Sequence, residues 1–484
     1  MSAPKVVSNH ERAIVIGGSM VGLAVARALS EHFREVVVVE KDSLSREAPE
    51  HRRGVQQSYH IHNLTMRGQR ELDELFPGFT EEALRLGAVR LDHGRDVARC
   101  TDVGFCPLFE TGFVALAATR TLMEFAERQR FRALVQNVLL LEGTRVEELL
   151  TEGEGSDIRA VGLRTDHAEH REIRGQLVVD CSGRAALWKK WFEDRKLPLP
   201  KETLVDSRCG YASRFYKVRD DSPYLNKAMT VDQLFPHRPQ WGVISPLEGN
   251  QWVVTIGGFN EMYPPNDEAG FASFGERFQT PLFQEWLSHA EPVTPVRTFR
   301  RLEMRWNHFE RTPPAMKNFL AVGDSVWAYN PLYGQGMSIG VTCARILRDV
   351  LRKDADLDTL ARRFYPAAKK FAFPAWESTA LLDLAWPGTQ GKRPWYTELS
   401  RRMGHTFLRA CQYEDEVFIA LLQALHMVKQ PLELMTPKVL MGMARYYLRR
   451  LTASLPPMDL TRLPERTSSA AVRNLPAEKT RNAA

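Results

Sequence analysis

The chain of 484 residues lacks several features that would place it in other classes of protein. It has no run of about 18 uncharged apolar residues, the length that a membrane helix needs. The longest candidate, residues 417–428, is interrupted by Gln423 and His426 and predicts a core helix instead. The first residues, MSAPKVVSNHER, are polar and do not resemble a signal peptide. We therefore expect no integral membrane segment and a cytoplasmic location.

Cysteine and clustered charge are also scarce. The six cysteines form no C-x-x-C pair, which predicts free thiols in a reducing compartment and neither a disulfide framework nor a zinc site. The net charge of +6 is spread along the chain without a compact basic stripe, so no nucleic-acid partner is expected. His60 and His62 stand two residues apart, but no third ligand cluster accompanies them, so no metal site is predicted.

The N-terminal region carries the pattern of a dinucleotide-binding fold. Residues 13–16 predict an apolar strand, GGSMVG (17–22) is a variant of G-x-G-x-x-G, and a second strand over 36–39 leads to Glu40. Gly17 permits a tight turn, Gly22 allows close packing of the following helix, and Glu40 stands where an acid binds an adenosine ribose. Ser19 replaces the usual second glycine, yet it is small enough for a pyrophosphate to approach. The order of strand, helix, strand and acid predicts dinucleotide binding.

A second motif, GDSVWAYNPLYGQGMSIG, spans residues 323–340. An apolar strand over 318–322 leads through Asp324 to Gly334-Gln335-Gly336, which open a helix that runs to about Leu351. The acid can accept hydrogen bonds from ribityl hydroxyls, and the glycines let the backbone approach a flat ring. The helix N-terminus offers N–H groups and positive charge where a reduced flavin becomes anionic. The run favours a flavin site, although taken alone it is equally an ordinary turn between strand and helix.

With RRGVQQSYHIHNLTMRGQREL (52–72), ATRTLMEF (118–125) and VVDCSGRAALWKKW (178–191), these motifs resemble the FAD-dependent monooxygenases of the aromatic-hydroxylase and squalene-epoxidase type. Within that group the chain looks most like bacterial natural-product flavoenzymes, including the epoxidases of polyether antibiotic pathways. The resemblance covers most of residues 11–385. It implies an α/β fold with a Rossmann-type, glutathione-reductase-like FAD-binding domain, an antiparallel β-sheet substrate domain and a C-terminal helical region.

The expected domain boundaries follow from this resemblance and from the local patterns. The FAD-binding domain would be discontinuous, with residues 96–111 outside its core, and the end of the chain is rich in Pro, Ser, Arg and Ala. We expect the FAD-binding domain at 11–205 and 305–351, the substrate-binding sheet at 206–304, the helical region at 352–453 and a disordered tail at 454–484.

The resemblance also assigns cofactor contacts residue by residue. Pro331, Gly334, Gln335, Gly336 and Met337 would lie along the isoalloxazine, and no catalytic side chain is assigned because the flavin carries the chemistry. The full set of expected FAD contacts comprises Gly17, Gly18, Ser19, Gly22, Glu40, Lys41, Arg52, Arg53, Arg120, Asp180, Gly183, Gly323, Asp324, Pro331, Gly334, Gln335, Gly336 and Met337.

The residues expected near the substrate have a second explanation. A pocket is expected near the flavin, but buried aromatic residues on strands and buried histidines are also common in protein cores. Arg52 and Arg53 would equally suit a solvated basic turn, and Arg120 a surface ion pair. The residues expected in the substrate pocket are His60, His62, Tyr211, Trp241, Trp252 and Tyr333.

The implied activity is a monooxygenase reaction of secondary metabolism, such as antibiotic biosynthesis. A flavin C4a-hydroperoxide would transfer oxygen from O2 to a small apolar polyene, isoprenoid or aromatic substrate, by hydroxylation or epoxidation. DCSGR (180–184) stands where NADPH-using hydroxylases carry a DG motif, so NAD(P)H would reduce the FAD either directly or through a separate flavin reductase.

Three alternatives stay open. One is a reductase of isoprenoid double bonds, of the geranylgeranyl reductase type. Another is a flavin-dependent halogenase, although WGVISP (241–246) has only one tryptophan of the W-x-W-x-I-P motif. The third is a protein that binds FAD without turnover.

Overall fold

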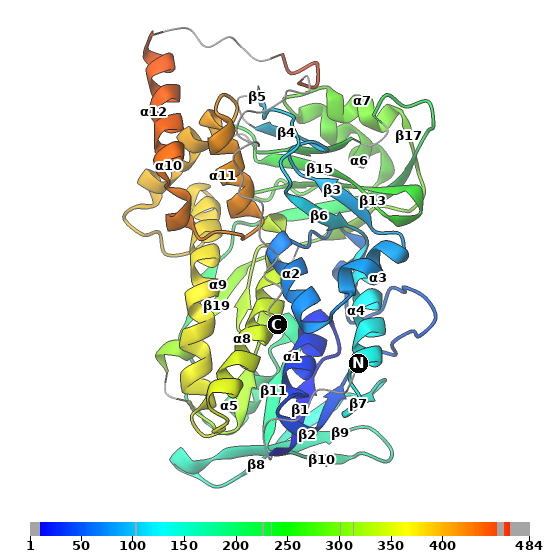
Figure 1. Cartoon of the computed structure of the whole chain (residues 1–484), viewed down its shortest axis with the longest axis vertical. Helices are drawn as coiled ribbons and strands as arrows, with labels where there is room; N and C mark the ends of the chain where they lie inside the picture. The colour runs from blue at the N-terminus through cyan, green and yellow to red at the C-terminus, as the bar shows by residue number, and fades with distance from the viewer. Residues whose placement is uncertain are drawn as a thin grey trace, which may run out of the picture.

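The computed structural model describes residues 10–101, 104–224, 227–233, 235–300, 302–312, 314–452 and 459–464. Figure 1 shows a parallel sheet with its helices in the lower part of the molecule, a second large sheet in the upper right, and the C-terminal helices along the left side. The predicted α/β class is confirmed.

A five-stranded sheet forms the centre of the lower part, in the order β20-β11-β1-β2-β7, and all of its pairs are parallel. Residues 13–16 and 36–39 are buried completely or nearly so, as expected for strands covered on both faces. The structure extends both predicted strands toward their N-terminal ends. The strands of this sheet are β1 (His10–Ile16), β2 (Phe33–Val39), β7 (Val138–Leu141), β11 (Leu177–Asp180) and β20 (Phe319–Ala321).

Helices cover this sheet, and two of them meet at the predicted motifs. Helix α1 follows the glycine motif, and α8 begins at Gly336 as predicted. A Cβ atom added to Gly340 would lie 2.4 Å from Cγ2 of Val21, so glycine lets α8 lie directly against α1. The helices of this part are α1 (Met20–Leu29), α2 (Met66–Leu75), α3 (Phe79–Arg85), α4 (Arg120–Leu134), α5 (Trp188–Asp194) and α8 (Gly336–Lys353).

Three small sheets complete this part of the molecule. An antiparallel meander of three strands follows β7, and two further small sheets join segments distant in sequence. The meander contains β8 (Val146–Glu152), β9 (Arg159–Thr165) and β10 (Glu172–Arg174). The other two contain β12 (Glu202–Val205), β19 (Met304–Asn307) and β21 (Trp327–Ala328), and β3 (Val89–Asp92) and β6 (Val114–Ala117).

The large sheet has eight strands, in the order β17-β13-β16-β15-β14-β4-β5 with β18 also paired to β13. Its pairs are antiparallel except for the parallel pair of β14 and β4. Helices α6 (Glu268–Phe274) and α7 (Leu282–Ser288) contribute to the core on one face. The strands are β4 (Val97–Thr101), β5 (Gly104–Phe105), β13 (Gly210–Val218), β14 (Ala228–Val231), β15 (Gln240–Pro246), β16 (Gln251–Gly258), β17 (Ala290–Pro292) and β18 (Arg297–Phe299).

Strands β4 and β5 join the large sheet although they come early in the chain. They lie within the predicted FAD-binding range 11–205 but pair with the large sheet, where Val97 stands opposite Ala228. Ala98 and Cys100 are fully buried in the core of that sheet together with Met229. Burial of this short apolar segment explains why it leaves the first domain, and it agrees with the expectation that 96–111 lies outside that domain's core.

The C-terminal region is helical, as the spacing of its apolar residues predicts. Most of the predicted tail lies outside the described residues, but within 459–464 the carbonyl of Leu460 accepts a hydrogen bond of 2.7 Å from Oγ1 of Thr280. In the part of the chain that the structure describes, every helix is too short or too polar to cross a bilayer. The helices of this region are α9 (Leu360–Ala385), α10 (Thr397–Ala410), α11 (Asp415–Leu425) and α12 (Pro437–Thr452).

Candidate functional site

The turn between β1 and α1 requires glycine at two positions. Gly17 has φ of 100°, and a Cβ atom there would lie 2.7 Å from the carbonyl oxygen of Cys181. A Cβ atom on Gly22 would lie 1.8 Å from the carbonyl oxygen of Gly17. Ser19 is the N-cap of α1, but its side chain caps no N–H group of the helix. The first N–H groups of α1 are therefore not taken up by a side-chain cap, as an anion-binding helix terminus requires.

Glu40 closes this turn from the end of β2. Its Oε2 accepts a hydrogen bond of 2.6 Å from the backbone N–H of Gly18. Its Oε1 accepts one of 2.9 Å from the backbone N–H of Asp42. The predicted ribose-binding acid thus lies directly beside the glycine turn. Lys41, also expected to contact the cofactor, is exposed next to it.

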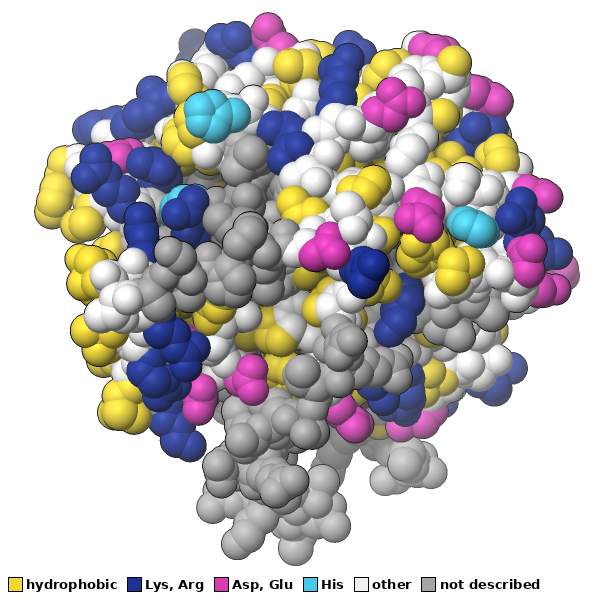
Figure 2. All heavy atoms as spheres, turned by 90° about the horizontal axis from the view of Figure 1, so that it is seen from above, with side chains coloured by type: hydrophobic (Ala, Val, Ile, Leu, Met, Phe, Trp, Pro, Cys, Tyr) yellow, Lys and Arg dark blue, Asp and Glu magenta, His cyan; other side chains and the backbone are white. Residues whose placement is uncertain are grey.

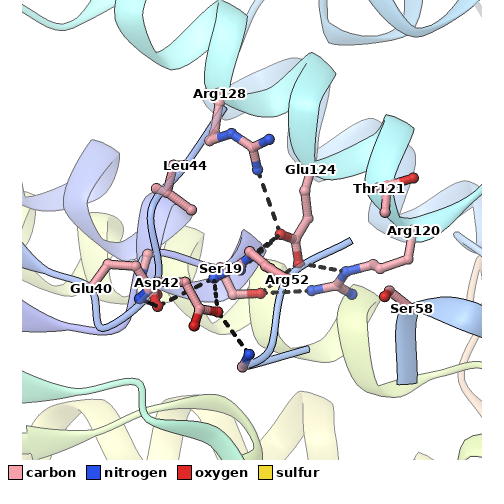
Figure 3. Close-up of polar contacts among 12 residues, drawn as sticks. Ser19, Glu40, Asp42, Leu44, Arg52, Ser58, Arg120, Thr121, Glu124 and Arg128 are labelled. Carbon is pink, nitrogen blue, oxygen red and sulfur yellow. Dashed lines mark hydrogen bonds and ion pairs between the residues drawn. The ribbon is translucent and has the colours of Figure 1, made fainter. Parts of the chain in front are cut away.

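A network of ion pairs joins the glycine turn to α4 (Figure 3). Glu124 Oε1 accepts hydrogen bonds of 2.8 Å from Ser19 Oγ and from Arg120 Nε. Arg120 also donates to Ser19 Oγ at 2.9 Å, and Arg52 donates to Glu124 Oε2 at 2.8 Å. Burial alone would raise the pKa of Glu124, but Arg120 and Arg52 outweigh it and lower that pKa to about 2. Glu124 therefore stays ionised, and the structure brings together Ser19, Arg52 and Arg120, three of the residues expected to contact FAD.

Glu124 is absent from the sequence-based site, although its position four residues after Arg120 on a predicted helix was a usable signal. The network also includes Arg128, whose guanidinium lies 3.6 Å from Glu124, while Arg52 reaches Glu40 at 3.3 Å. Arg53 points to the surface and is exposed, so the two neighbouring arginines differ in environment. Of these two neighbours, Arg52 belongs to the ion-pair network at the glycine turn and Arg53 does not.

The turn after β11 packs beside the glycine turn. The carboxylate of Asp180 accepts hydrogen bonds from the backbone N–H groups of Ser182 at 2.8 Å and Trp188 at 3.0 Å. Asp180 is fully buried, and burial raises its pKa. The carboxylate therefore stabilises its own turn, and the backbone of Cys181 is what faces the glycine motif. Gly183, one of the expected FAD contacts, has φ of 70°, which favours glycine, and its Cβ position faces open space.

Asp324 lies in the turn after β20. Its side chain is 41% exposed, yet the surrounding protein raises its pKa by burial, against the opposing effects of Arg184 and Arg120. The two observations agree if the carboxylate is reached by solvent inside a cleft that protein surrounds. A Cβ atom on Gly336 would lie 3.6 Å from Asp324 Oδ1, so this carboxylate lies beside the first turn of α8.

The loop before α8 presents backbone and polar groups to the same region. Gly334 has φ of 65°, and a Cβ atom there would lie 3.2 Å from Cβ of Asn63. Gln335 is the N-cap of α8 without a side-chain cap, and its buried Oε1 has no hydrogen-bond partner. Pro331 is exposed, while Gly336 and Met337 are half-buried. An unpartnered amide oxygen at an uncapped helix terminus fits a site that a polar ligand completes.

Asp383 on α9 fixes the loop before α8 through hydrogen bonds. No local sequence motif predicts this role. It is fully buried and accepts hydrogen bonds from Tyr333 Oη at 2.7 Å, Asn330 Nδ2 at 3.0 Å and Ser207 Oγ at 3.1 Å. Burial raises the pKa of Asp383 to about 6, although the three donors oppose the shift. Tyr333, which was expected in the substrate pocket, is thereby tied to the C-terminal helices.

Three of the expected substrate residues meet on one face of the large sheet. His60 Nδ1 lies 2.9 Å from Ser213 Oγ, and its ring packs edge-on against Tyr211 with centroids 4.7 Å apart. Tyr211 and Trp241 belong to one aromatic cluster, which also contains Trp386. Burial lowers the pKa of His60 to about 3, so this ring is neutral and carries no fixed charge into an apolar region.

His62 and Trp252 lie elsewhere. Burial, with a smaller effect of Arg120, lowers the pKa of His62 to about 4, which places this ring near the ion-pair network. Trp252 stands opposite Tyr216 and packs against Trp286 with centroids 5.5 Å apart. Because side chains alternate between the faces of a strand, Tyr216 points away from Tyr211. Trp252 is therefore part of the core under α7, separate from the other residues of the expected pocket.

A surface depression of about 550 Å³ does not coincide with these loops. It is lined by residues of the meander and α5, including Glu148 and Arg164, which form an ion pair of 2.7 Å. Its charged walls do not suit an apolar ligand. Among the described residues, no group of three His, Cys, Asp or Glu side chains is arranged to hold a metal ion.

Comparison with known proteins places this geometry in a recognised fold. No protein-family model matches the chain. Protein Rv3254 of Mycobacterium tuberculosis (strain ATCC 25618 / H37Rv) is 29% identical over 398 residues, which cover 79% of this chain and 82% of that protein. The flavin-dependent brominase Bmp2 superposes with a TM-score of 0.61 at 14% identity, over 92% of this chain and 100% of its own. PqsL, a probable FAD-dependent monooxygenase from Pseudomonas aeruginosa, gives a TM-score of 0.56 at 15% identity, over 77% and 94% of the two chains.

The chain has the fold of the FAD-dependent monooxygenases. This finding confirms the Rossmann-type architecture that the sequence motifs imply. A brominase shares the fold, so the fold alone does not distinguish oxygenation from halogenation.

Proposed function

We propose that this protein binds FAD and is a monooxygenase that hydroxylates or epoxidises a small apolar molecule. The observation that carries the proposal is the meeting of three loops at one edge of the parallel sheet. They follow β1, β11 and β20, which are neighbours in the sheet, and ligands of open α/β sheets bind at the carboxyl ends of such strands. The loops after β1 and β20 contribute features that suit a flavin dinucleotide, and the loop after β11 packs its Cys181 backbone against Gly17.

The adenosine and pyrophosphate end fits the first loop. Glu40 would accept hydrogen bonds from the ribose, while the N-terminus of α1 and Ser19 would face the pyrophosphate. Arg120 and Arg52 are already held by Glu124, so they would be oriented before the ligand arrives. Adding the negative pyrophosphate would let these arginines share their hydrogen bonds between Glu124 and the ligand.

The ribityl chain and the ring fit the third loop. Asp324, whose side chain is 41% exposed, would accept hydrogen bonds from ribityl hydroxyls or lie beside the pyrophosphate. The backbone over 331–337 would run along the ring, and Gly334 and Gly336 leave room for that contact. Bound FAD would supply the redox chemistry that activates O2.

The protein's own contribution is electrostatic and steric. The N-terminus of α8 directs its positive end toward the ring region, which stabilises negative charge there by about 1–3 kcal/mol. Asp383 fixes the loop through Asn330 and Tyr333, so that the donors do not move during the reaction. The aromatic cluster around Tyr211 and Trp241 excludes water and favours an apolar substrate.

The proposal also includes the source of the electrons that reduce the FAD. NAD(P)H would reduce the cofactor directly or through a separate flavin reductase. The two routes differ in a simple experiment: anaerobic NADPH either bleaches the FAD of the purified protein by itself or does so only after a flavin reductase is added.

The proposed activity is tested with purified protein, FAD, a reducing system and ¹⁸O₂. Apolar polyenes, isoprenoids and aromatic compounds are incubated with and without bromide, and the products are analysed by mass spectrometry. One atom of ¹⁸O in a product supports the proposal. A brominated product assigns halogenation instead, and a product with two added hydrogens assigns double-bond reduction. Failure of the protein to bind FAD would overturn the whole proposal.

A further inference from the structure

Helix α12 presents an apolar face that no described part of the chain covers. Its buried residues, Val439, Gly442 and Tyr446, lie on one side, and the helix packs against α11. A different set of apolar residues recurs at spacings of three, four and seven, and therefore lies on another side of the helix. That set is strongly exposed: Leu440 53%, Met441 55%, Tyr447 55%, Leu448 59% and Leu451 66%.

Helix α10 adds to this surface. Trp395, just before the helix, is 89% exposed, and Leu399 and Met403 are 55% and 56% exposed. Leu399 and Met403 are four apart on the helix and therefore lie on one side of it. Helices α10 and α12 are in contact and occupy the same flank of the molecule in Figure 1. Seen from above in Figure 2, this flank shows hydrophobic side chains interspersed with Lys and Arg.

The charged residues of α12 itself all have one sign. Helix α12 contains Lys438, Arg445, Arg449 and Arg450 and no acidic residue. Lys438, Arg445 and Arg449 are spaced seven and four apart, so they form a row along the helix next to the apolar face. Arg445 and Arg449 also contact the buried Glu414, which fixes that row in place.

We propose that the α10–α12 surface, defined by these exposed apolar residues and the basic row, docks the protein on an anionic lipid membrane. A helix with an apolar face flanked by Lys and Arg lies in the plane of the headgroups, with its apolar side chains in the acyl boundary. Trp395 and Tyr447 combine an apolar ring with a polar atom, as residues at that boundary do. The basic side chains of α12 would contact the anionic headgroups, Lys438 and Arg450 most directly, because Arg445 and Arg449 already pair with Glu414.

The basic charge of α12 favours an anionic membrane over a second copy of the chain as the partner of this surface. A face-to-face dimer through α12 would bring two basic rows together, and like charges at such a contact oppose association. A bilayer with anionic lipids supplies both the apolar phase and the negative charge. The inference stands independently of the proposed enzyme activity, although a membrane would also be a source of apolar substrate.

Vesicle flotation tests the docking surface. The probes are vesicles of phosphatidylcholine alone and of phosphatidylcholine mixed with phosphatidylglycerol, at low and high salt. The full chain is expected to float with the mixed vesicles, and less so at high salt because electrostatic attraction is screened. Replacing Leu448→Gln and Leu451→Gln together should reduce the partition coefficient at least tenfold. The matched control, Leu199→Gln with Val293→Gln, changes two exposed apolar residues elsewhere and should leave it unchanged.

A charge variant separates the two components of binding. Lys438→Gln with Arg450→Gln should weaken flotation with mixed vesicles, while Arg445 and Arg449 are left in place because they contact Glu414. Thermal unfolding of each variant shows that the fold is retained. The proposal is overturned if the unmodified protein does not float, or if the Leu448 and Leu451 variant floats equally well. It is also overturned if α12 instead holds a dimer that this variant converts to monomer without any effect of lipid.

Discussion

The hydroxyl of Ser19 donates a hydrogen bond of 2.8 Å to Oε1 of Glu124, a residue 105 positions later in the chain. Ser19 begins α1 and Glu124 lies on α4, so the bond ties two helices together at the glycine turn. Arg120 donates to both residues. This triangle gives a physical reason for serine at the place of the usual second glycine, since glycine would leave Glu124 without one of its donors.

The first prediction concerns Glu124. Glu124→Gln should lower the free energy of unfolding of the FAD-free protein by about 2–4 kcal/mol, because Arg120 would stay buried without its ion-pair partner and Arg52 would lose the nearest of its three carboxylates. Urea unfolding of the variant and the unmodified protein measures the difference. The matched control is Glu11→Gln, which breaks the exposed pair with Arg34 and should cost less than about 1 kcal/mol. Equal effects of the two variants would contradict the importance of the buried network.

The second prediction compares two glycines. Gly22→Ala should destabilise the protein by at least about 3 kcal/mol or prevent folding, because the new methyl group would overlap the carbonyl of Gly17. Gly404→Ala, in α10, meets nothing within 4 Å and should stabilise the helix by about 0.5–1 kcal/mol. Guanidinium unfolding of both variants checks the opposite signs. A Gly22→Ala protein as stable as the unmodified chain would contradict the close packing of this turn.

The features that sequence reasoning predicts are local ones. The strands around Gly17 and the helix that begins at Gly336 follow from runs of apolar residues, from glycine and from the 3.6-residue period. Arg120 could be placed at the start of a helix because Thr119 is a favourable N-cap before an apolar pattern. Each of these signals lies within about twenty residues of the element that it predicts.

What the sequence leaves unpredicted depends on tertiary contacts. Asp383 lies 53 residues after Asn330, inside a helix, and only the packing of α9 brings it to the loop before α8. Trp252 and Trp241 look alike in the sequence, but strand register places them on opposite faces of the large sheet. The pairing of β4 with β14 likewise joins segments that share no local pattern. Such contacts depend on which elements meet, and local spacing does not encode that.

The third prediction concerns Asp324. Asp324→Ala should weaken FAD binding at least tenfold, because a carboxylate that accepts hydrogen bonds from ribityl hydroxyls contributes about 1.5–3 kcal/mol. The free energy of unfolding without FAD should change by less than about 1 kcal/mol, since Arg184 is 3.9 Å away and the side chain is 41% exposed. Fluorescence titration with FAD measures the affinity. Asp221→Ala, at a site whose side chain is 78% exposed, serves as the control. Unchanged affinity in the Asp324 variant would show that the ribityl role is wrong.

The fourth prediction is a pH dependence at Asp383. Its pKa is raised from 3.8 to about 6 by burial, so the folded state holds this proton more tightly than the unfolded state does. Its contribution to stability is therefore fully present below pH 4, declines as pH rises between about 4 and 6, and is lost above. The difference corresponds to about 3 kcal/mol between the two limits.

Asp383→Asn removes this titration while keeping an oxygen that can accept hydrogen bonds from Tyr333 and Asn330. The difference in unfolding free energy, variant minus unmodified protein, should therefore become more positive by up to about 3 kcal/mol as pH rises from 4 to 7. Urea unfolding across this range measures it, and taking the difference cancels the titration of the buried histidines, which both proteins share. A difference that stays constant with pH would mean that Asp383 is ionised in the folded protein throughout, and that its three donors outweigh the effect of burial.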